Sequence, residues 1–223
     1  MEFKLDILSN SFFIGIMEQL LNNSTLLKLL SINRKMIYAR KYIRKLICHN
    51  SNNSDKSVVT FIESFENLRL LSLQNVKNVD YIRKLKFPKH LHNLNLSNNN
   101  LSSDDLKNIE FPAKLRVLTL NNNWIENLNF KIPQKIKWLN ISYNIIKSID
   151  SIFFPKSLKM ISLSSNLLTD DSFNEFNGSK RLKFIDISEN KISKLKIIFI
   201  CNKFKIIAKY YTMKYYTQSN MLY

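Results

Sequence analysis

LHNLNLSNNNL, at residues 91–101, is a phrase that returns down the chain with the same spacing of aliphatic residues and asparagine. Further copies are LRVLTLNNNWI (115–125), IKWLNISYNII (136–146), LKMISLSSNLL (158–168) and LKFIDISENKI (182–192), and a weaker one, LRLLSLQNVKN (68–78), lies upstream. Successive copies start 21 to 24 residues apart. A period of this length indicates an array of similar structural units that stack on one another.

The centre of each copy alternates apolar and polar residues with a period of two, which is typical of a short β-strand with one buried face. The phrase resembles the leucine-rich repeat, LxxLxLxxNxL, over about residues 65–195. The resemblance implies an α/β solenoid in which short parallel strands, one in each coil, line a concave face.

One asparagine stands at the ninth position of each full copy, where the chain leaves the strand. These residues are Asn99, Asn123, Asn144, Asn166 and Asn190. Because an amide both donates and accepts hydrogen bonds, we expect each one to bond its own turn and the neighbouring coil. Their predicted role is structural and not catalytic.

The segments between the copies carry apolar residues that are expected to close the core from the convex side. They are Leu106, Ile109, Phe130, Ile149, Ile152, Phe173 and Phe176. Four coils have a proline (Pro88, Pro112, Pro133 and Pro155) three residues before the first aliphatic position, which stops a helix from running into the strand. LSSDDL (101–106) and LTDDSF (168–173) predict helical turns, because Ser or Thr followed by acids is a helix start signal.

The composition argues against an enzyme. Gly15 and Gly178 are isolated, so the chain has no Gly-rich phosphate loop. Cys48 and Cys201 are too few for a disulfide framework or a zinc cluster, and the three histidines, His49, His90 and His92, lack metal-ligand spacing. We therefore predict a non-catalytic protein with no cofactor and no bound metal.

The formal net charge is +17, which raises nucleic acid or an acidic membrane surface as a partner. A second explanation is codon bias, because Asn, Lys and Ile all have AT-rich codons. The composition resembles that of repeat families of large DNA viruses with AT-rich genomes. Both explanations of the charge stay open here.

Residues 1–50 lack the repeat and are predicted to form helices over 11–21, 25–38 and 39–48. Residues 51–64 are assigned to a linker and the start of the first coil, 65–198 to a solenoid of about six coils, and 199–223 to a basic, aromatic C-terminal cap. Glu2, Asp6 and Asn10 interrupt what a signal peptide would need as an apolar core, and Ile197–Ile200 is too short to span a membrane. We expect a cytoplasmic protein, in the host cell if the source is a virus.

The segment LSNSFFIGIMEQLLNNSTLLKLLSINRKMIYA (8–39) is similar to an F-box, the helical module by which substrate receptors dock onto the Skp-type adaptor of cullin ubiquitin ligases. This resemblance implies adaptor contacts at Leu8, Phe12, Ile16, Leu27 and Leu30. The alternative is a helical cap that shields the first coil of the solenoid.

The variable positions beside the inward leucines predict the binding surface, because neighbouring residues of a strand face opposite sides of the sheet. The basic column consists of the second positions, Arg69, His92, Arg116, Lys137, Lys159 and Lys183. The apolar column consists of the third positions, Leu70, Asn93, Val117, Trp138, Met160 and Phe184. Trp and Arg are frequent interface anchors, so we expect an acidic, partly apolar protein surface to dock across Arg116, Trp138 and Met160.

These patterns favour a protein-interaction module that binds through its concave face, with the N-terminal helices as a link to a ubiquitin ligase. The alternative is a nucleic-acid-binding protein that uses the basic column and the Lys/Tyr-rich C-terminus, since charge and aromatic stacking together hold single strands.

Overall fold

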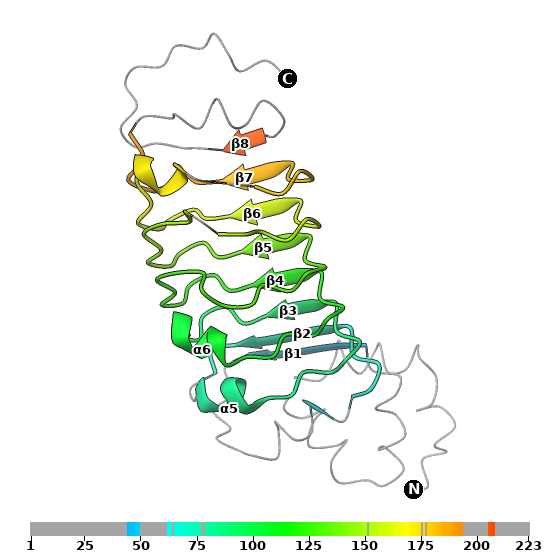
Figure 1. Ribbon diagram of the computed structural model, residues 1–223. Coiled ribbons are helices and arrows are strands. Elements are labelled where there is room, and N and C mark those ends of the chain that lie inside the picture. The colour runs from blue at the N-terminus through cyan, green and yellow to red at the C-terminus, as the bar shows by residue number, and fades with distance from the viewer. Residues whose placement is uncertain are drawn as a thin grey trace, which may run out of the picture.

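Parallel strands stack into one sheet that runs through the described part of the chain (Figure 1). The computed structural model describes residues 44–49, 62–63, 65–76, 79–150, 152–174, 176, 178–193 and 205–207. The strands are β1 (Lys45–His49), β2 (Leu70–Gln74), β3 (Asn93–Asn95), β4 (Val117–Thr119), β5 (Trp138–Asn140), β6 (Met160–Ser162), β7 (Phe184–Asp186) and β8 (Lys205–Ile207). They lie in the order of the sequence, each one parallel to the next. The predicted α/β solenoid of short parallel strands is therefore confirmed.

The strand ladder extends further at both ends than the repeat pattern indicates. The helix predicted over 39–48 is wrong at its end, because Lys45–His49 is a strand that pairs in register with β2. Pairing with a strand more than twenty residues away overrides the local helical pattern. At the other end, β8 pairs with β7 inside the segment assigned to a C-terminal cap. The predicted adaptor contacts Leu8, Phe12, Ile16, Leu27 and Leu30 lie outside the described residues, as does most of 199–223.

The centre of the core is a column of aliphatic side chains, one from the middle of each strand from β3 to β7. Leu94, Leu118, Leu139, Ile161 and Ile185 are partners in register across β3 to β7, and each is at most 1% exposed. Second and third columns, at the first and sixth repeat positions, are buried in the same way. Each coil completes its burial only against its neighbours, so the coils stabilise one another.

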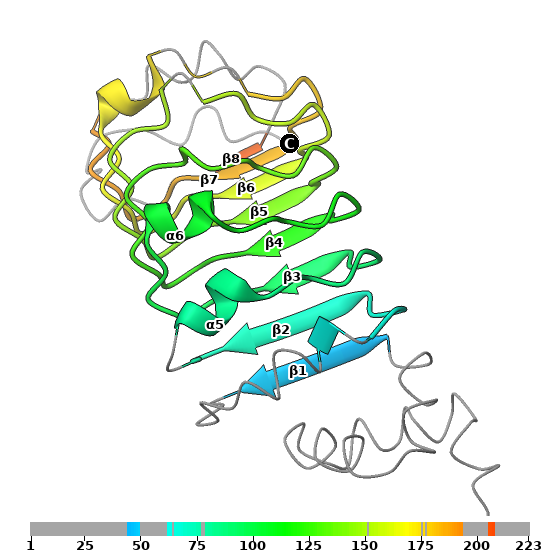
Figure 2. The same cartoon turned by 60° about the horizontal axis from the view of Figure 1, so that its bottom comes forward.

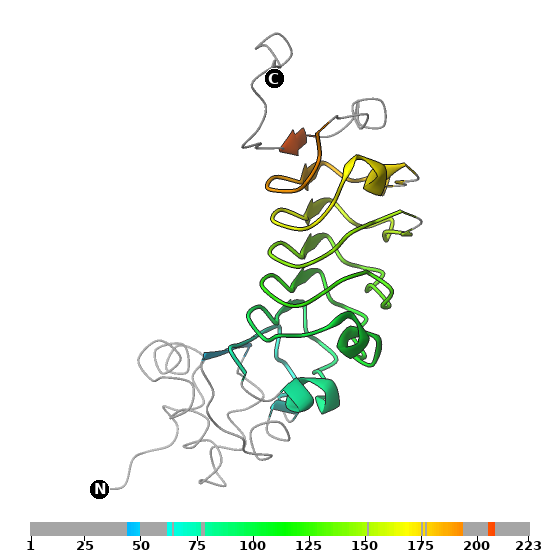
Figure 3. The same ribbon diagram turned by 90° about the vertical axis from the view of Figure 1, so that its left-hand side faces the viewer.

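The convex side closes the core as the sequence predicts. Leu106, Ile109, Phe130, Ile149, Phe173 and Phe176 are buried, and Ile152 packs partly buried against them. Figure 3 shows the coils from the side, with helices α5 (Val79–Lys84), α6 (Ser103–Lys107) and η3 (Asp170–Phe173) away from the strands. Helices α6 and η3 lie in the two segments where a helical turn is predicted. Helix α5 is not foreseen by the sequence analysis.

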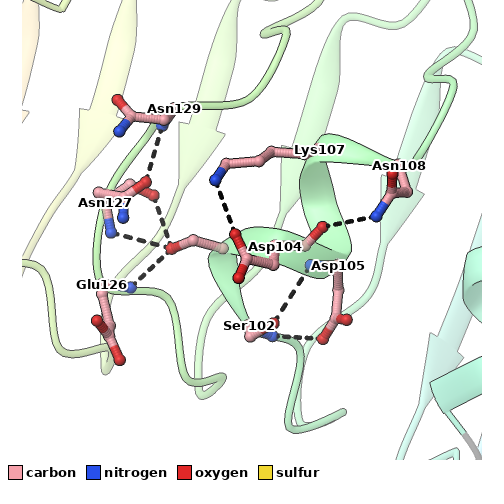
Figure 4. Close-up of polar contacts among 9 residues, drawn as sticks. Ser102, Asp104, Asp105, Lys107, Asn108, Glu126, Asn127 and Asn129 are labelled. Atoms are coloured by element: carbon pink, nitrogen blue, oxygen red, sulfur yellow. Dashed lines mark hydrogen bonds and ion pairs between the residues drawn. The ribbon is translucent and has the colours of Figure 1, made fainter.

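Side-chain oxygens at the start of helix α6 tie two coils together (Figure 4). The Ser102 hydroxyl accepts from the backbone N–H of Asp105, and the Asp105 carboxylate accepts from the backbone N–H of Ser102, which makes a capping box. The buried Ser103 hydroxyl accepts from the backbone N–H groups of Glu126 and Asn127 in the next coil. Arg83 of helix α5 forms ion pairs with Asp80 and Asp105, and the second of these joins helix α5 to helix α6. Figure 2 shows these two helices on the same side of the sheet.

The asparagines at the ninth repeat position form a ladder of hydrogen bonds between coils. The Asn144 side-chain oxygen accepts from the backbone N–H of Ile125, and its amide nitrogen donates to the carbonyls of Leu120 and Ile141. Asn123 and Asn166 repeat this pattern in the neighbouring coils. Asn99 and Asn190 make the same kinds of bond at the two ends of the ladder. The side chain thus takes the place of a backbone partner where each strand ends.

The residue before each of these asparagines has left-handed backbone geometry. Asn98, Asn122, Tyr143, Ser165 and Glu189 have φ between 51° and 59°. Asparagine tolerates this conformation, whereas larger side chains are uncommon in it. The tight turn after every strand therefore explains part of the asparagine content of the repeats.

Candidate functional site

The apolar column lies on the outward face of the sheet, which we call the sheet face, and each residue of the basic column directly precedes a strand. In the apolar column, Trp138 is 43% exposed and Met160 is 39% exposed, and the two are partners in register on β5 and β6. Leu70, Asn93, Val117 and Phe184 are only partly exposed. The structure therefore places the most open apolar surface of this column at its middle, on β5 and β6.

The basic column is a continuous ladder and is longer than the sequence indicates. The backbone N–H of each member donates to the carbonyl of the member in the preceding coil: His92 to Arg69, Arg116 to His92, Lys137 to Arg116, Lys159 to Lys137 and Lys183 to Lys159, at 2.7 to 2.9 Å. The N–H of Arg69 donates in the same way to the carbonyl of Arg44, at 2.8 Å. Arg44 is therefore a seventh member. Sequence analysis missed it because the first coil lacks the repeat phrase.

The basic column has no acidic partners among the described residues. The salt bridges among the described residues join Arg83 to Asp80 and Asp105, and Lys107 to Asp104, and all of them lie on the convex side. All members of the column except His92 are exposed. Their charges thus face solvent and are available to an anionic partner.

Two more exposed aromatic side chains lie where strands end. Trp124 is 62% exposed and donates from its indole nitrogen to the Asn100 side chain in the preceding coil, at 3.1 Å. Tyr143 is 57% exposed and occupies the strained left-handed position after β5. Sequence analysis did not single out either residue, although both stand at variable positions of the repeat phrase. A bulky exposed side chain at a position that favours asparagine suggests a role other than stability.

The pKa of His92 is affected by the positive charges of the basic column. Its pKa lies below the ordinary value of 6.5, first because burial disfavours the charged imidazole and then because Arg116, Arg69, Lys114 and His90 repel a further positive charge. The Lys114 amine lies 3.0 Å from the His90 ring nitrogen Nδ1. Several cationic groups thus converge here, and none of them takes part in the salt bridges found among the described residues.

We expect this cluster to make folding weakly acid-sensitive. The pKa of His92 is lower in the folded protein than in the unfolded chain. As the pH falls below 6.5, the unfolded chain therefore takes up a proton before the folded protein does. The stability due to neutral His92 is thus present above pH 6.5 and declines below it. An NMR titration of the His92 ring should give a pKa below 6.5, and Arg116→Gln should move it upward. A His92 pKa at or above 6.5 in the wild type would contradict this.

The described residues include no group of three or more His, Cys, Asp or Glu that could hold a metal ion. No helix in the described part of the chain is long and apolar enough to cross a membrane. The distinctive chemistry of the described residues is therefore that of a surface: positive charge beside exposed aromatic and thioether groups.

Comparison with known proteins agrees with this architecture. Residues 134–192 match the family model described as leucine rich repeat. Over 108 residues, 47% of this chain, the sequence is 32% identical to Toll-like receptor 7 of Drosophila melanogaster, and the match covers 7% of that protein. Over 152 residues, 66% of this chain, it is 24% identical to lumican of Gallus gallus and covers 43% of it. The chain thus spans less than half the length of either relative.

Among solved structures, internalin C2 of Listeria monocytogenes superposes with a TM-score of 0.54, covering 84% of this chain and 92% of that one. At 15% identity this likeness shows the fold alone. The match at residues 134–192 and the ladder of parallel strands on both sides of it together support a leucine-rich-repeat solenoid.

Proposed function

We propose that this chain is a non-catalytic binding protein whose sheet face takes a partner protein with an acidic and partly apolar surface. The observation that carries the proposal is the Trp138–Met160 pair, two large exposed side chains on adjacent strands. Large apolar groups that remain exposed side by side are typical of surfaces that become covered by a partner.

Charge around this pair defines what the partner must present. The backbone N–H of Trp138 donates to the carbonyl of Arg116, which places the two residues side by side on adjacent coils, and Lys137 precedes Trp138 in the chain. The partner should therefore set an apolar group against Trp138 and carboxylates against Arg116 and Lys137. Burial of an aromatic anchor with satisfied charges at its rim is the usual composition of an interface hot spot.

Trp138→Ala should reduce binding of the natural partner by at least about tenfold, because a tryptophan anchor commonly contributes about 2 kcal/mol or more. Tagged full-length protein would be used to recover partners from lysate, with quantitative mass spectrometry on wild type, Trp138→Ala and Phe153→Ala. Phe153 is 86% exposed on the segment that returns to the next strand, so it controls for loss of an exposed aromatic elsewhere. Equal recovery by wild type and Trp138→Ala would contradict the site.

We also propose that the segment of residues 8–39 docks a Skp-type adaptor, so that the chain acts in the cytoplasm as a substrate receptor for a cullin-type ubiquitin ligase. This part rests on the similarity of residues 8–39 to an F-box. Calorimetry of the full chain with a purified Skp-type adaptor tests it directly. We expect micromolar or tighter binding that is lost in Leu27→Asp/Leu30→Asp while the melting of the repeats is unchanged. No heat with the wild type would leave these residues as a cap on the solenoid.

A further inference from the structure

A second surface lies along the amino ends of the strands. It shares Arg116 and Lys137 with the Trp138–Met160 site and extends from there over the turns that precede the strands. Each coil enters its strand through a tight turn, in which the first leucine position donates its N–H to a carbonyl three residues earlier: Leu91 to Pro88, Leu115 to Pro112, Ile136 to Pro133, Leu158 to Pro155 and Leu182 to Ser179. The two central residues of each turn project at the corner between the convex side and the sheet face. Together with the basic column they form one flank of the solenoid.

This flank, which we call the basic edge, is lined by cationic side chains in every described coil. Its Lys and Arg residues are Arg44, Arg69, Lys89, Lys114, Arg116, Lys135, Lys137, Lys156, Lys159, Lys180, Arg181 and Lys183. All of them are exposed. His90 and His92 add two titratable groups.

Codon bias does not explain the basic edge, because it adds lysine without regard to position. Of the twenty Lys and Arg between Arg44 and Lys191 whose side chains are described, these twelve lie on the edge, while Glu66 is the only described acid among the turn-corner and second-position residues. At the opposite ends of the strands the corresponding turns carry Asn98, Asn122, Tyr143, Ser165 and Glu189. The two flanks of one repeat array thus differ in charge, which indicates selection for a cationic strip.

We propose that the basic edge binds double-stranded nucleic acid through the phosphate backbone, without reading bases. Stacked strands lie about 4.8 Å apart, so the seven rungs from Arg44 to Lys183 give a straight strip about 30 Å long. A duplex carries one phosphate charge per ~1.7 Å of axis, so such a strip spans about nine base pairs and a dense row of anions. Protein surfaces usually mix charges of both signs. A partner protein therefore matches a uniformly positive strip of this length less well than a duplex does.

The side chains of the edge favour a duplex over a single strand. Proteins that hold single strands stack the bases on aromatic rings, and the turn corners and second positions contain no Phe, Tyr or Trp in the coils from Glu66 to Lys183. Trp124, Trp138 and Tyr143 lie on the sheet face or at the carboxyl ends of the strands, away from these turns. Contact by charge alone gives affinity that is independent of sequence and falls steeply with salt.

The test is fluorescence anisotropy of a labelled 24-base-pair DNA duplex of random sequence with the full chain, between 50 and 300 mM NaCl. The edge variant is Lys135→Gln/Lys156→Gln/Lys180→Gln/Arg181→Gln. The matched control is Lys84→Gln/Lys86→Gln/Lys131→Gln/Lys147→Gln. It removes the same number of positive charges, four, from exposed sites outside the strands and the turns that precede them. Circular dichroism melting verifies that both variants fold as the wild type does.

We expect the edge variant to bind the duplex at least tenfold more weakly at 100 mM NaCl. The slope of log affinity against log salt should fall by about 3 to 4, since each phosphate contact contributes ~0.9. The control should change affinity less than threefold, and Trp138→Ala should leave it unchanged, which separates this surface from the proposed protein site. Equal losses in the edge variant and the control would overturn the proposal. So would tighter binding to the single strand, or binding to poly-glutamate as tight as to the duplex, which would indicate an acidic protein instead.

Discussion

Replacing Asn144 with alanine should destabilise the middle of the solenoid by ~1–3 kcal/mol, because buried backbone groups would lose their partners. The Asn144 side chain is 6% exposed. It accepts from the N–H of Ile125 and donates to the carbonyls of Leu120, Ile141 and Ser142, which belong to its own coil and the preceding one. The loss therefore combines the hydrogen bonds themselves with the desolvation of what remains.

Differential scanning calorimetry of the full chain measures the effect, with a decrease of roughly 2–4 °C in Tm for each kcal/mol in a protein of this size. Asn129→Ala is the control, because Asn129 is exposed and its side chain makes no hydrogen bond that spans coils in the described structure. A Tm for Asn144→Ala within error of the wild type would show that the asparagine ladder does not stabilise the repeats.

Leu139→Ala should have the larger effect, a loss of ~2–5 kcal/mol, because it leaves a cavity in the most enclosed part of the core. Leu139 is fully buried between Leu118 and Ile161, its partners in register on the two neighbouring strands. The coils on both sides of Leu139 are themselves held in place by further coils. The surrounding side chains therefore cannot move in to fill the cavity. Because stability in a repeat array is a sum over neighbouring coils, the variant should also broaden the transition or split it into two.

Met160→Ala gives the comparison for Leu139→Ala, since Met160 is also an apolar residue of the strand ladder but faces outward. We expect less than about 1 kcal/mol for that change, as for most surface substitutions. If both variants melted at the same temperature, the assignment of inward and outward faces to these strands would be wrong.

The repeat phrase by itself determined the central coils. Period-two alternation and a recurring leucine predict β2 to β7 in their observed register, with Leu118 and Leu139 inside and Trp138 outside. Ser or Thr followed by acids predicts the helical turns at α6 and η3. The sequence predicts these features because each depends only on the residues within one coil and on the repetition of the same pattern in the next coil.

Only the tertiary structure decided where the array begins and which further charged residues align with the basic column. Lys45–His49 has no repeat phrase, and it is a strand because β2, more than twenty residues later, offers it a hydrogen-bonding edge. The same pairing places Arg44 next to Arg69 on the preceding coil, which lengthens the basic column by one residue. The turn corners that complete the basic edge lie on different coils, and their alignment follows from stacking. A sequence pattern shows the period of a chain, whereas the neighbours across a sheet are fixed by long-range packing and hydrogen bonding.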